Sequence, residues 1–240
     1  MAKPKRRTSE TPTEATELRI VGGKFRGRKL LYEPFLSDDG AVTRPMKHRV
    51  RESIFNLVGM GAQGRHAIDL FAGTGALGLE ALSRGSTWAT FIERHVPTAR
   101  VIEENIKRLD VQAQTTLLTT SAFLWGKREL FKAESGERKA EENTSSSDSA
   151  FRPPLSALPW LVFCSPPFSF FVDRLSEMVE LITNIMERSP ADSVVVVESD
   201  ERFDFEQLPA LGGEEFKESN WDVRFYAPAV VGVWRKAPAK

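Results

Sequence analysis

The sequence has a single cysteine, Cys164, among its 240 residues, so the chain cannot form an internal disulfide. It has only three histidines, and neither these nor the cysteine form a cluster with metal-ligand spacing. No stretch approaches the roughly 20 apolar residues that a membrane-spanning helix needs, and the first residues are polar and basic. We therefore expect a cytoplasmic protein without a structural metal, a membrane segment or a signal peptide.

Net charge is zero overall, with 33 basic and 33 acidic side chains, but the charge is unevenly distributed. Residues 1 to 51 contain thirteen Lys and Arg against six Asp and Glu, and the rest of the chain carries the opposite excess. Lys and Arg bind polyanions by displacing counterions from phosphates. The asymmetry is typical of a nucleic-acid partner, and equally of a solvated tail followed by an ordinary charged helix.

The N-terminal region up to residue 60 differs in pattern from the remainder. Residues 1 to 17 are polar with almost nothing apolar, which indicates a disordered tail. Residues 18 to 32 hold two β-prone runs around glycines, which predicts a hairpin with exposed basic residues. Thr43 and Pro45 are typical of a helix start. We expect residues 18 to 60 to form a small RNA-binding hairpin and helix, with Lys47, Arg49 and Arg51 toward solvent or a ligand.

Residues 61 to 236 alternate between β-prone and helix-prone segments. The expected strands are 67–71, 88–92, 115–118, 160–164 and 193–198, and the expected helices are 76–84, 97–109, 122–131 and 170–187. Such repeats predict an α/β fold, a mainly parallel sheet with helices on both faces. Two last β-rich runs, 221–226 and 229–234, are too close for a crossover helix and should pair antiparallel at the edge. The expected sheet therefore has seven strands.

A low-complexity polar run occupies about 133–154 and has no hydrophobic period. Strand and helix patterns resume on both sides of it. We interpret it as a surface insertion within the domain, with a functional lid as the alternative.

A glycine-rich turn follows the strand expected at 67–71. Gly73 and Gly75 permit the turn and the close approach of a ligand, and Gly78 lets the next helix sit tightly on the sheet. Glu93 ends the following strand, twenty positions after Gly73. A carboxylate there can accept hydrogen bonds from ribose hydroxyls. The two features together predict a nucleoside cofactor.

The glycine pattern does not choose among cofactors, because it also satisfies the dinucleotide fingerprint. Two features weigh against a nicotinamide: an acidic residue, Asp69, precedes the turn, and the turn lies well inside the chain after a basic module. We interpret Asp69 as lying near the charged amino-acid portion of the cofactor. The alternative is that its carboxylate caps backbone amides of the loop.

The strand expected at 160–164 ends in Ser165-Pro166-Pro167-Phe168. Two prolines cannot extend a central strand, so the chain must leave the sheet on a stiff course. The turn would direct Ser165 and a backbone carbonyl into the cleft at the carboxyl ends of the strands. Phe168 could then stack on a planar base. The plainer alternative, that the prolines end the strand and Phe168 is core, is disfavoured by the glycine turn upstream.

At these residues the sequence resembles the Rossmann-like class I methyltransferases of exocyclic amines, whose motif is [Asp/Asn/Ser]-Pro-Pro-[Tyr/Phe/Trp]. Within them it is most similar to the RsmD-type guanine-N2 methyltransferases of small-subunit ribosomal RNA. The matching segments follow one another in order and approximate spacing from residue 18 to about 171, and they are 19–30, 44–45 with 49–56, and 69–81.

The resemblance implies transfer of a methyl group from S-adenosyl-L-methionine to the N2 amine of a guanine in small-subunit rRNA. It implies a monomer that acts on this rRNA or on the assembling small ribosomal subunit. It gives catalytic roles to Ser165, Pro166, Pro167 and Phe168. It gives cofactor contacts to Asp69, Phe71, Ala72, Gly73, Thr74, Gly75, Glu93, Arg94, Ser121 and Ala122. The residues expected to bind RNA phosphates are Lys24, Arg26, Arg28, Arg44, Arg49 and Arg51.

Two positions depart from the family pattern. Ser165 stands where Asp is usual, and a neutral hydroxyl accepts a hydrogen bond less strongly than a carboxylate. Ser121 and Ala122 stand where many relatives have an acidic residue for the adenine amino group. Three alternatives therefore stay open: an amino-methyltransferase for adenine N6 or cytosine N4, a catalytically weakened RNA-binding homologue, and a nicotinamide oxidoreductase.

Overall fold

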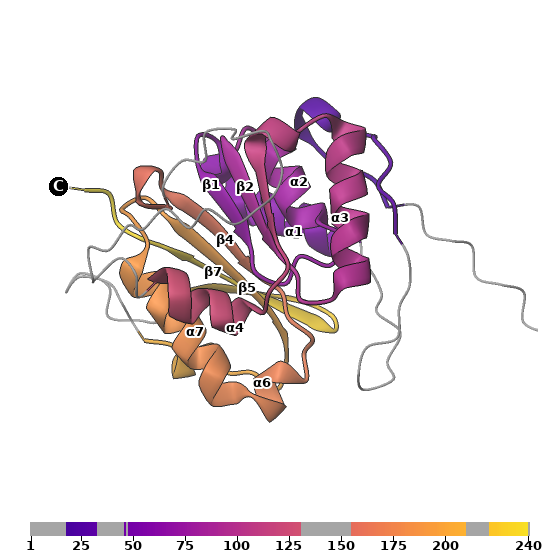
Figure 1. The fold of residues 1–240 in the computed structure, drawn as a ribbon. Coiled ribbons are helices and arrows are strands. Elements are labelled where there is room, and N and C mark those ends of the chain that lie inside the picture. Colours follow the sequence, from indigo (N-terminus) through magenta and orange to yellow (C-terminus); the bar gives the residue numbers. More distant parts are fainter. Residues whose placement is uncertain (1–17, 33–45, 47, 131–154, 210–220, 240) are drawn as a thin grey trace, which may run out of the picture.

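The computed structural model describes residues 18–32, 46, 48–130, 155–209 and 221–239, and these form a seven-stranded sheet with helices packed on it (Figure 1). The strand order is β3-β2-β1-β4-β5-β7-β6, in which β1 to β5 run parallel and β7 runs antiparallel to β5 and β6. The predicted parallel sheet with an antiparallel edge is confirmed. The strand bounds are β1 (His66–Asp69), β2 (Trp88–Ile92), β3 (Thr115–Leu118), β4 (Trp160–Cys164), β5 (Val194–Asp200), β6 (Trp221–Tyr226) and β7 (Ala229–Arg235).

Helices cover both faces of the sheet because successive side chains of its central strands point to opposite faces and most of them are apolar. One face carries α1 (His48–Val58), α2 (Ala76–Ser83) and α3 (Val96–Leu109), which share a core with Ala67 and Phe163 (Figure 1). The other carries α4 (Ala122–Trp125), α6 (Phe170–Asp173) and α7 (Leu175–Arg188), which share a second core with Ile68 and Val162. Short 3-10 turns are η1 (Gly23–Phe25), η2 (Gly59–Ala62), η3 (Gln112–Gln114), η5 (Leu155–Ala157) and η6 (Phe205–Gln207).

Two predicted helices differ in detail from the observed ones. The helix expected at 122–131 is α4 followed by a π-helical turn, η4 (Gly126–Leu130). The helix expected at 170–187 is two helices, α6 and α7, because Arg174 leaves the helical region at φ −134° and ψ 32°. The Arg174 guanidinium lies 3.9 Å from the ring centroid of Phe123 and bonds to Glu177. Hydrophobic periodicity could not reveal this break, because it depends on a contact with α4.

The predicted N-terminal hairpin is present in reduced form. Residues 18 to 32 fold back on themselves through one antiparallel bridge, between Arg19 and Lys29. The amide of Leu30 donates to the carbonyl of Leu18 at 2.8 Å, and the chain reverses around η1. Leu18, Leu30 and Ile20 are buried in the core that α1 and α2 share. These three apolar side chains anchor the loop, which has no two-stranded ladder.

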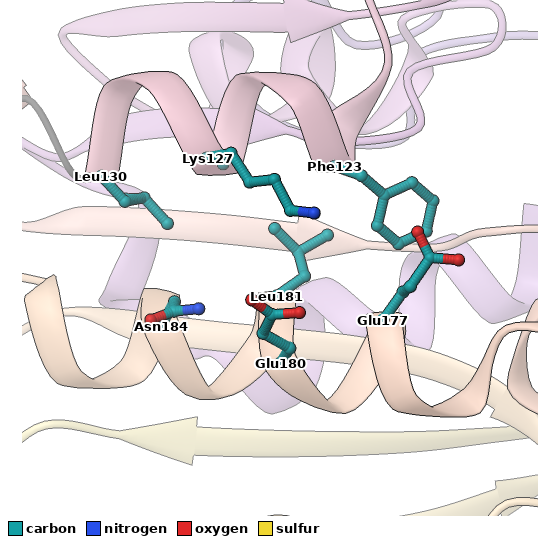
Figure 2. A pocket seen from close by; sticks show the side chains of 8 residues that line it. Phe123, Lys127, Leu130, Glu177, Glu180, Leu181 and Asn184 are labelled. Atoms are coloured by element: carbon teal, nitrogen blue, oxygen red, sulfur yellow. The ribbon is translucent and has the colours of Figure 1, made fainter.

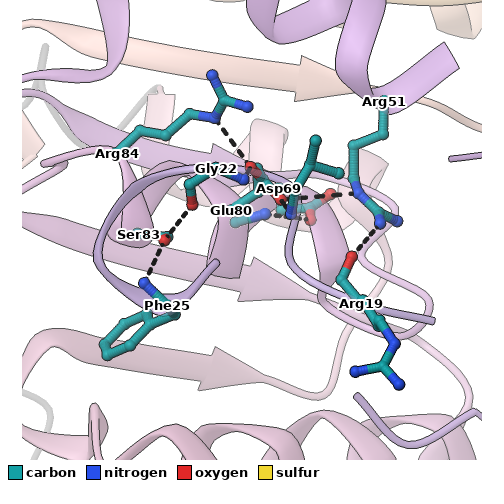
Figure 3. A network of polar contacts seen from close by, with 10 residues as sticks. Arg19, Gly22, Phe25, Arg51, Asp69, Glu80, Ser83 and Arg84 are labelled. Carbon is teal, nitrogen blue, oxygen red and sulfur yellow. Dashed lines mark hydrogen bonds and ion pairs between the residues drawn. The ribbon is translucent and has the colours of Figure 1, made fainter. Parts of the chain in front are cut away.

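Glu80 of α2 fastens this N-terminal loop to the domain (Figure 3). Its fully buried carboxylate accepts hydrogen bonds from the amides of Val21 and Gly22, both at 2.7 Å, and from Nε of Arg84 at 2.8 Å. Arg51 of α1 completes the cluster, with its Nε 3.8 Å from Glu80. One carboxylate thus joins the N-terminal loop, α1 and α2, which are far apart in sequence.

The prediction that Arg51 faces solvent or a ligand is wrong. Its side chain is fully buried, and its Nη2 donates to the carbonyl of Arg19 (Figure 3). Burial lowers the pKa of Arg51, and the negative charge of Glu80 partly offsets this effect. Helical periodicity alone treats every arginine as a surface residue, because it cannot show that a buried acid lies opposite.

Several expectations fall outside the described residues. They concern the tail at 1–17, the helix start at Thr43 and Pro45, the side chains of Arg44 and Lys47, and the insertion at 133–154. Within the described residues, no helix is long and apolar enough to cross a bilayer.

Substituting Glu80→Gln should cost about 3–5 kcal/mol of unfolding free energy, because Arg51 would be left as a buried charge without its counterion. Urea denaturation followed by circular dichroism measures the loss. The matched control is Glu103→Gln, which removes an exposed acid bonded to Lys107 at 2.7 Å and should leave stability nearly unchanged. Equal effects of the two variants would show that Glu80 does not hold the fold together.

Candidate functional site

The glycine turn, Glu93 and Ser165 meet at one edge of the sheet. The turn follows β1, and β1 lies between its parallel neighbours β2 and β4. Glu93 comes directly after β2 and Ser165 directly after β4. Because parallel strands present their carboxyl ends at the same edge, the three segments lie together at the edge where open α/β sheets bind ligands.

The glycines of the turn have the conformations that the sequence predicted. Gly73 and Gly75 have φ of 53° and 76°, in the left-handed region that favours glycine. A Cβ added to Gly73 would meet no described atom within 4 Å, so its backbone borders open space. At Gly78, by contrast, a Cβ would lie 2.4 Å from the ring of Phe91. The turn therefore borders open space at Gly73, while α2 packs directly on β2.

Glu93 is joined to the glycine turn by hydrogen bonds. Its Oε2 accepts from the amide of Gly73 at 2.9 Å, and its Oε1 accepts from the amide of His95 at 2.8 Å. The structure thus brings together the two features from which a nucleoside cofactor was predicted. Contact of this half-buried carboxylate with a ribose stays a prediction. Contact of the exposed Arg94 with the cofactor also stays a prediction.

Asp69, at the end of β1, is a buried carboxyl group with one oxygen bonded. Its Oδ2 accepts from the amide of Gly78 at 3.1 Å, in the first turn of α2. This contact is the amide capping that the sequence analysis kept as the alternative. Among the described residues, no donor reaches Oδ1. Burial raises the pKa of Asp69 to about 7, against the opposing effect of the Gly78 amide. Proximity to the cofactor's amino-acid portion stays a prediction.

Ser165 is hydrogen-bonded to an acid that the sequence analysis missed. Its Oγ donates to Oε2 of Glu198, which belongs to the neighbouring strand β5 and is 7% exposed. Burial raises the pKa of Glu198, and the bond from Ser165 opposes this shift. A signal was present in the sequence: Glu198 follows directly after a run of four valines.

The remainder of the Pro-Pro motif is divided between core and surface. Pro166 is buried, Pro167 is exposed, and Phe168 is half-buried against the core shared by α1 and α2. Phe168 therefore packs on the core, as the plainer alternative predicted. It is also partly exposed, which stacking on a base requires. Whether it stacks on a base stays a prediction.

An aromatic cluster borders the glycine turn and was not predicted. The ring centroid of Phe71, a residue of the turn, lies 6.1 Å from that of Phe123 and 6.0 Å from that of Phe170. Arg174 covers Phe123 and Phe170 with its guanidinium. These residues come from three separate elements, so only the tertiary structure could assemble them.

Ser121 has a local structural role. Its Oγ accepts from the amide of Leu124 at 3.1 Å and caps the N-terminus of α4. Ala122 is buried. The position therefore explains why a hydroxyl residue is acceptable there, while its predicted contact with a cofactor stays untested.

The predicted phosphate-binding residues have different environments. Lys24, Arg26 and Arg28 are exposed on the N-terminal loop, and Arg49 is exposed on α1. Arg28 also donates to the carbonyl of Arg108 on α3. Arg51 does not belong to this group, because its side chain is buried. We call the three exposed cations of the N-terminal loop, Lys24, Arg26 and Arg28, the basic loop.

A small pocket lies elsewhere, between α7 and the segment of α4 and η4 (Figure 2). Lys127 and Phe123 line one side, and Glu177 and Leu181 line the other. It contains none of the residues predicted to bind a cofactor or to act in catalysis. In the described part of the chain, no group of three or more His, Cys, Asp or Glu side chains could hold a metal ion.

Comparison with known proteins identifies the family. A model of the family described as Conserved hypothetical protein 95 matches residues 18–212. The chain belongs to this family. The match to the Conserved hypothetical protein 95 family covers the N-terminal loop, the glycine turn, the Pro-Pro motif and Glu198.

Curated relatives match a shorter part. The Haemophilus influenzae protein named ribosomal RNA small subunit methyltransferase D is 37% identical over 105 residues, which are 44% of this chain and 52% of that protein. The Escherichia coli K12 protein of the same name is 42% identical over 93 residues, which are 39% of this chain and 44% of that protein. The chain thus spans about half the length of the curated relatives it matches.

Solved structures support the fold. The Escherichia coli protein yhhF superposes with a TM-score of 0.61 over 93% of this chain and 99% of its own, at 24% identity. A hypothetical protein from Thermus thermophilus superposes with a TM-score of 0.60 over 90% of this chain and 98% of its own, at 21% identity. At such identities these likenesses bear on the architecture alone.

Substituting Asp69→Asn should stabilise the protein at neutral and alkaline pH. Below about pH 4 the carboxyl is protonated in both the folded and the unfolded chain, so the variant gains nothing. As the pH rises toward 7, only the unfolded chain loses its proton, and the folded wild type becomes progressively less stable. The gain from Asn should therefore grow across this window, to an upper limit on the order of 4 kcal/mol.

Thermal unfolding of both proteins between pH 4 and 8 measures this difference. The control is Asp173→Asn, which removes an exposed carboxylate. A difference between wild type and Asp69→Asn that is constant with pH would contradict the assigned shift.

Proposed function

We propose that the chain is an S-adenosylmethionine-dependent methyltransferase that modifies the N2 amine of a guanine in small-subunit ribosomal RNA. The observation that carries the proposal is the meeting of the glycine turn, Glu93 and Ser165 with its two prolines at one sheet edge. The names of the Haemophilus influenzae and Escherichia coli relatives support the rRNA substrate. The guanine N2 position comes from the motif resemblance.

The residues at this edge fit the proposed cofactor. Gly73 offers open backbone for the nucleoside, and Glu93 offers a carboxylate for ribose hydroxyls. The unbonded Oδ1 of Asp69 fits a positively charged amino group, which would also favour the ionised carboxyl. When bound, the cofactor would supply an activated methyl group: the carbon–sulfur bond would break with its electron pair left on sulfur, the amine nitrogen would form the new carbon–nitrogen bond, and a proton would leave the amine for solvent.

The chain itself provides alignment and polarisation. In the proposed complex the target base leaves the RNA stack and lies on Phe168. Its amine hydrogens are accepted by Ser165 and by the carbonyl of Pro166, which the stiff Pro-Pro backbone holds in place. Since the methyl donor is already activated, most of the rate gain would come from holding nitrogen, methyl carbon and sulfur in line.

The basic loop would bind the RNA backbone. Lys24, Arg26 and Arg28 are exposed on one segment, and Arg49 is exposed on α1. We place the protein in the cytoplasm, where it would act as a monomer on free small-subunit rRNA or on the assembling subunit.

Methyl transfer to under-methylated small ribosomal subunits, with labelled S-adenosylmethionine and nuclease mapping of the product, tests the proposal. Label is expected on a guanine N2, and Phe168→Ala should lower transfer at least about tenfold, because the base loses its stacking surface. A matched control is Phe225→Ala, which removes an exposed ring on β6. Cofactor binding without label on any RNA would instead favour the weakened RNA-binding homologue, and label on adenine or cytosine would change the substrate.

The double variant Lys24→Gln/Arg26→Gln should weaken RNA binding and reduce its salt dependence. Each phosphate contact contributes about one unit to the slope of log K against log salt. Filter binding of small-subunit rRNA at several salt concentrations measures this slope. Arg224→Gln, at an exposed position of β6, is the control and should leave the slope unchanged. An unchanged slope in the double variant would remove these two residues from the RNA surface.

A further inference from the structure

The hydroxyl of Ser165 poses a chemical problem for the proposed reaction. A serine oxygen has one proton and two lone pairs, so it can donate to a substrate as well as accept from it. The target amine presents its N–H hydrogens to the acceptor. An O–H hydrogen pointing toward them would repel them. A residue in this position must therefore direct its own proton away from the amine.

Glu198 provides the place to which that proton goes. Ser165 Oγ donates to Glu198 Oε2, and the pairing of Cys164 with Val197 in β4 and β5 sets the two residues side by side. Ser165 directly follows β4 and Glu198 lies in the carboxyl-terminal half of the parallel strand β5, toward the edge that carries the glycine turn. The contact is therefore built into the sheet register rather than into a flexible loop.

We propose that Glu198 is a positioning residue that accepts a hydrogen bond from the Ser165 hydroxyl and so leaves both lone pairs of Oγ free to accept from the target amine. This inference rests on the proposed methyl transfer. The pair Ser165 and Glu198 then performs the task of the single carboxylate that relatives usually have at position 165. The carboxylate is supplied from the next strand, through a hydroxyl.

The energetic setting of Glu198 supports a functional role. Its side chain is 7% exposed on a strand whose preceding residues are apolar. In the part of the chain that the structure describes, no Lys or Arg forms an ion pair with it, and burial raises its pKa. A buried acid with so little compensation lowers stability, so an apolar residue here would serve the fold better. A hydrogen bond to an ionised acceptor also strengthens the acceptor character of the donor's oxygen.

The test measures kcat and KM for methyl transfer from labelled S-adenosylmethionine to under-methylated small ribosomal subunits. Ser165→Ala and Glu198→Gln should each lower kcat about 10- to 100-fold, the effect of one lost hydrogen bond to a charged group. The double variant should be no slower than either single variant, because both changes remove the same function. KM for the cofactor should stay within about twofold of wild type.

A rescue experiment moves the carboxylate from position 198 to position 165 and measures whether methyl transfer returns. Ser165→Asp alone sets two carboxyl groups side by side, and their repulsion keeps one of them protonated. Ser165→Asp combined with Glu198→Gln has one carboxylate, which faces the amine and accepts from the new amide. This double variant should recover at least about tenfold over Glu198→Gln. A purely structural role of Glu198 would not produce such recovery.

Thermal unfolding of each variant separates folding from function. If Glu198→Gln fails to fold, Glu198→Asp carries the test, because it keeps the buried carboxylate but withdraws it by one methylene from Ser165 Oγ, so kcat should still fall. Full activity of Glu198→Gln, additive losses, or no rescue would overturn the role of Glu198 while leaving the proposed function standing. Wild-type protein that binds the cofactor but transfers no label would overturn the proposed function and this inference with it.

Discussion

Parallel pairing of β1 with both β2 and β4 is the constraint on which the rest of the structure depends. The ladder continues past the end of β1, where the amide of Leu70 donates to the carbonyl of Phe163 and the amide of Ala72 donates to that of Ile92, both at 3.0 Å. These bonds tie the start of the glycine turn to both neighbouring strands. The turn, Glu93 and Ser165 are held at one edge because their strands share this register.

Three buried acids show that a carboxylate can either stabilise the fold or belong to the candidate site. Glu80 accepts three hydrogen bonds and faces Arg51, so its charge is compensated and it joins the N-terminal loop to the helices. Asp69 and Glu198 each have one hydrogen bond among the described contacts, and burial raises the pKa of both. Incompletely compensated acids cluster at functional sites, since selection for stability alone would remove them.

The aromatic cluster and the Pro-Pro turn complete the rigid surroundings of the edge. Phe71 belongs to the glycine turn, yet its ring packs on Phe123 and Phe170 from the opposite helical layer. Arg174 breaks the predicted helix at 170–187 and covers two of these rings. Packing from both faces of the sheet therefore holds the residues that flank this edge.

The sequence by itself determined the strand and helix alternation, the glycine turn with its acidic partner, and the Pro-Pro motif, because each depends on local periodicity or backbone restriction. It could not determine the environment of a charge. Arg51 shares a helix with exposed Arg49 but meets Glu80 in the interior, and Glu198 is 33 positions from Ser165. Only the tertiary structure decided these pairings, because they depend on which strands and helices become neighbours, and this is set by long-range packing rather than by local pattern.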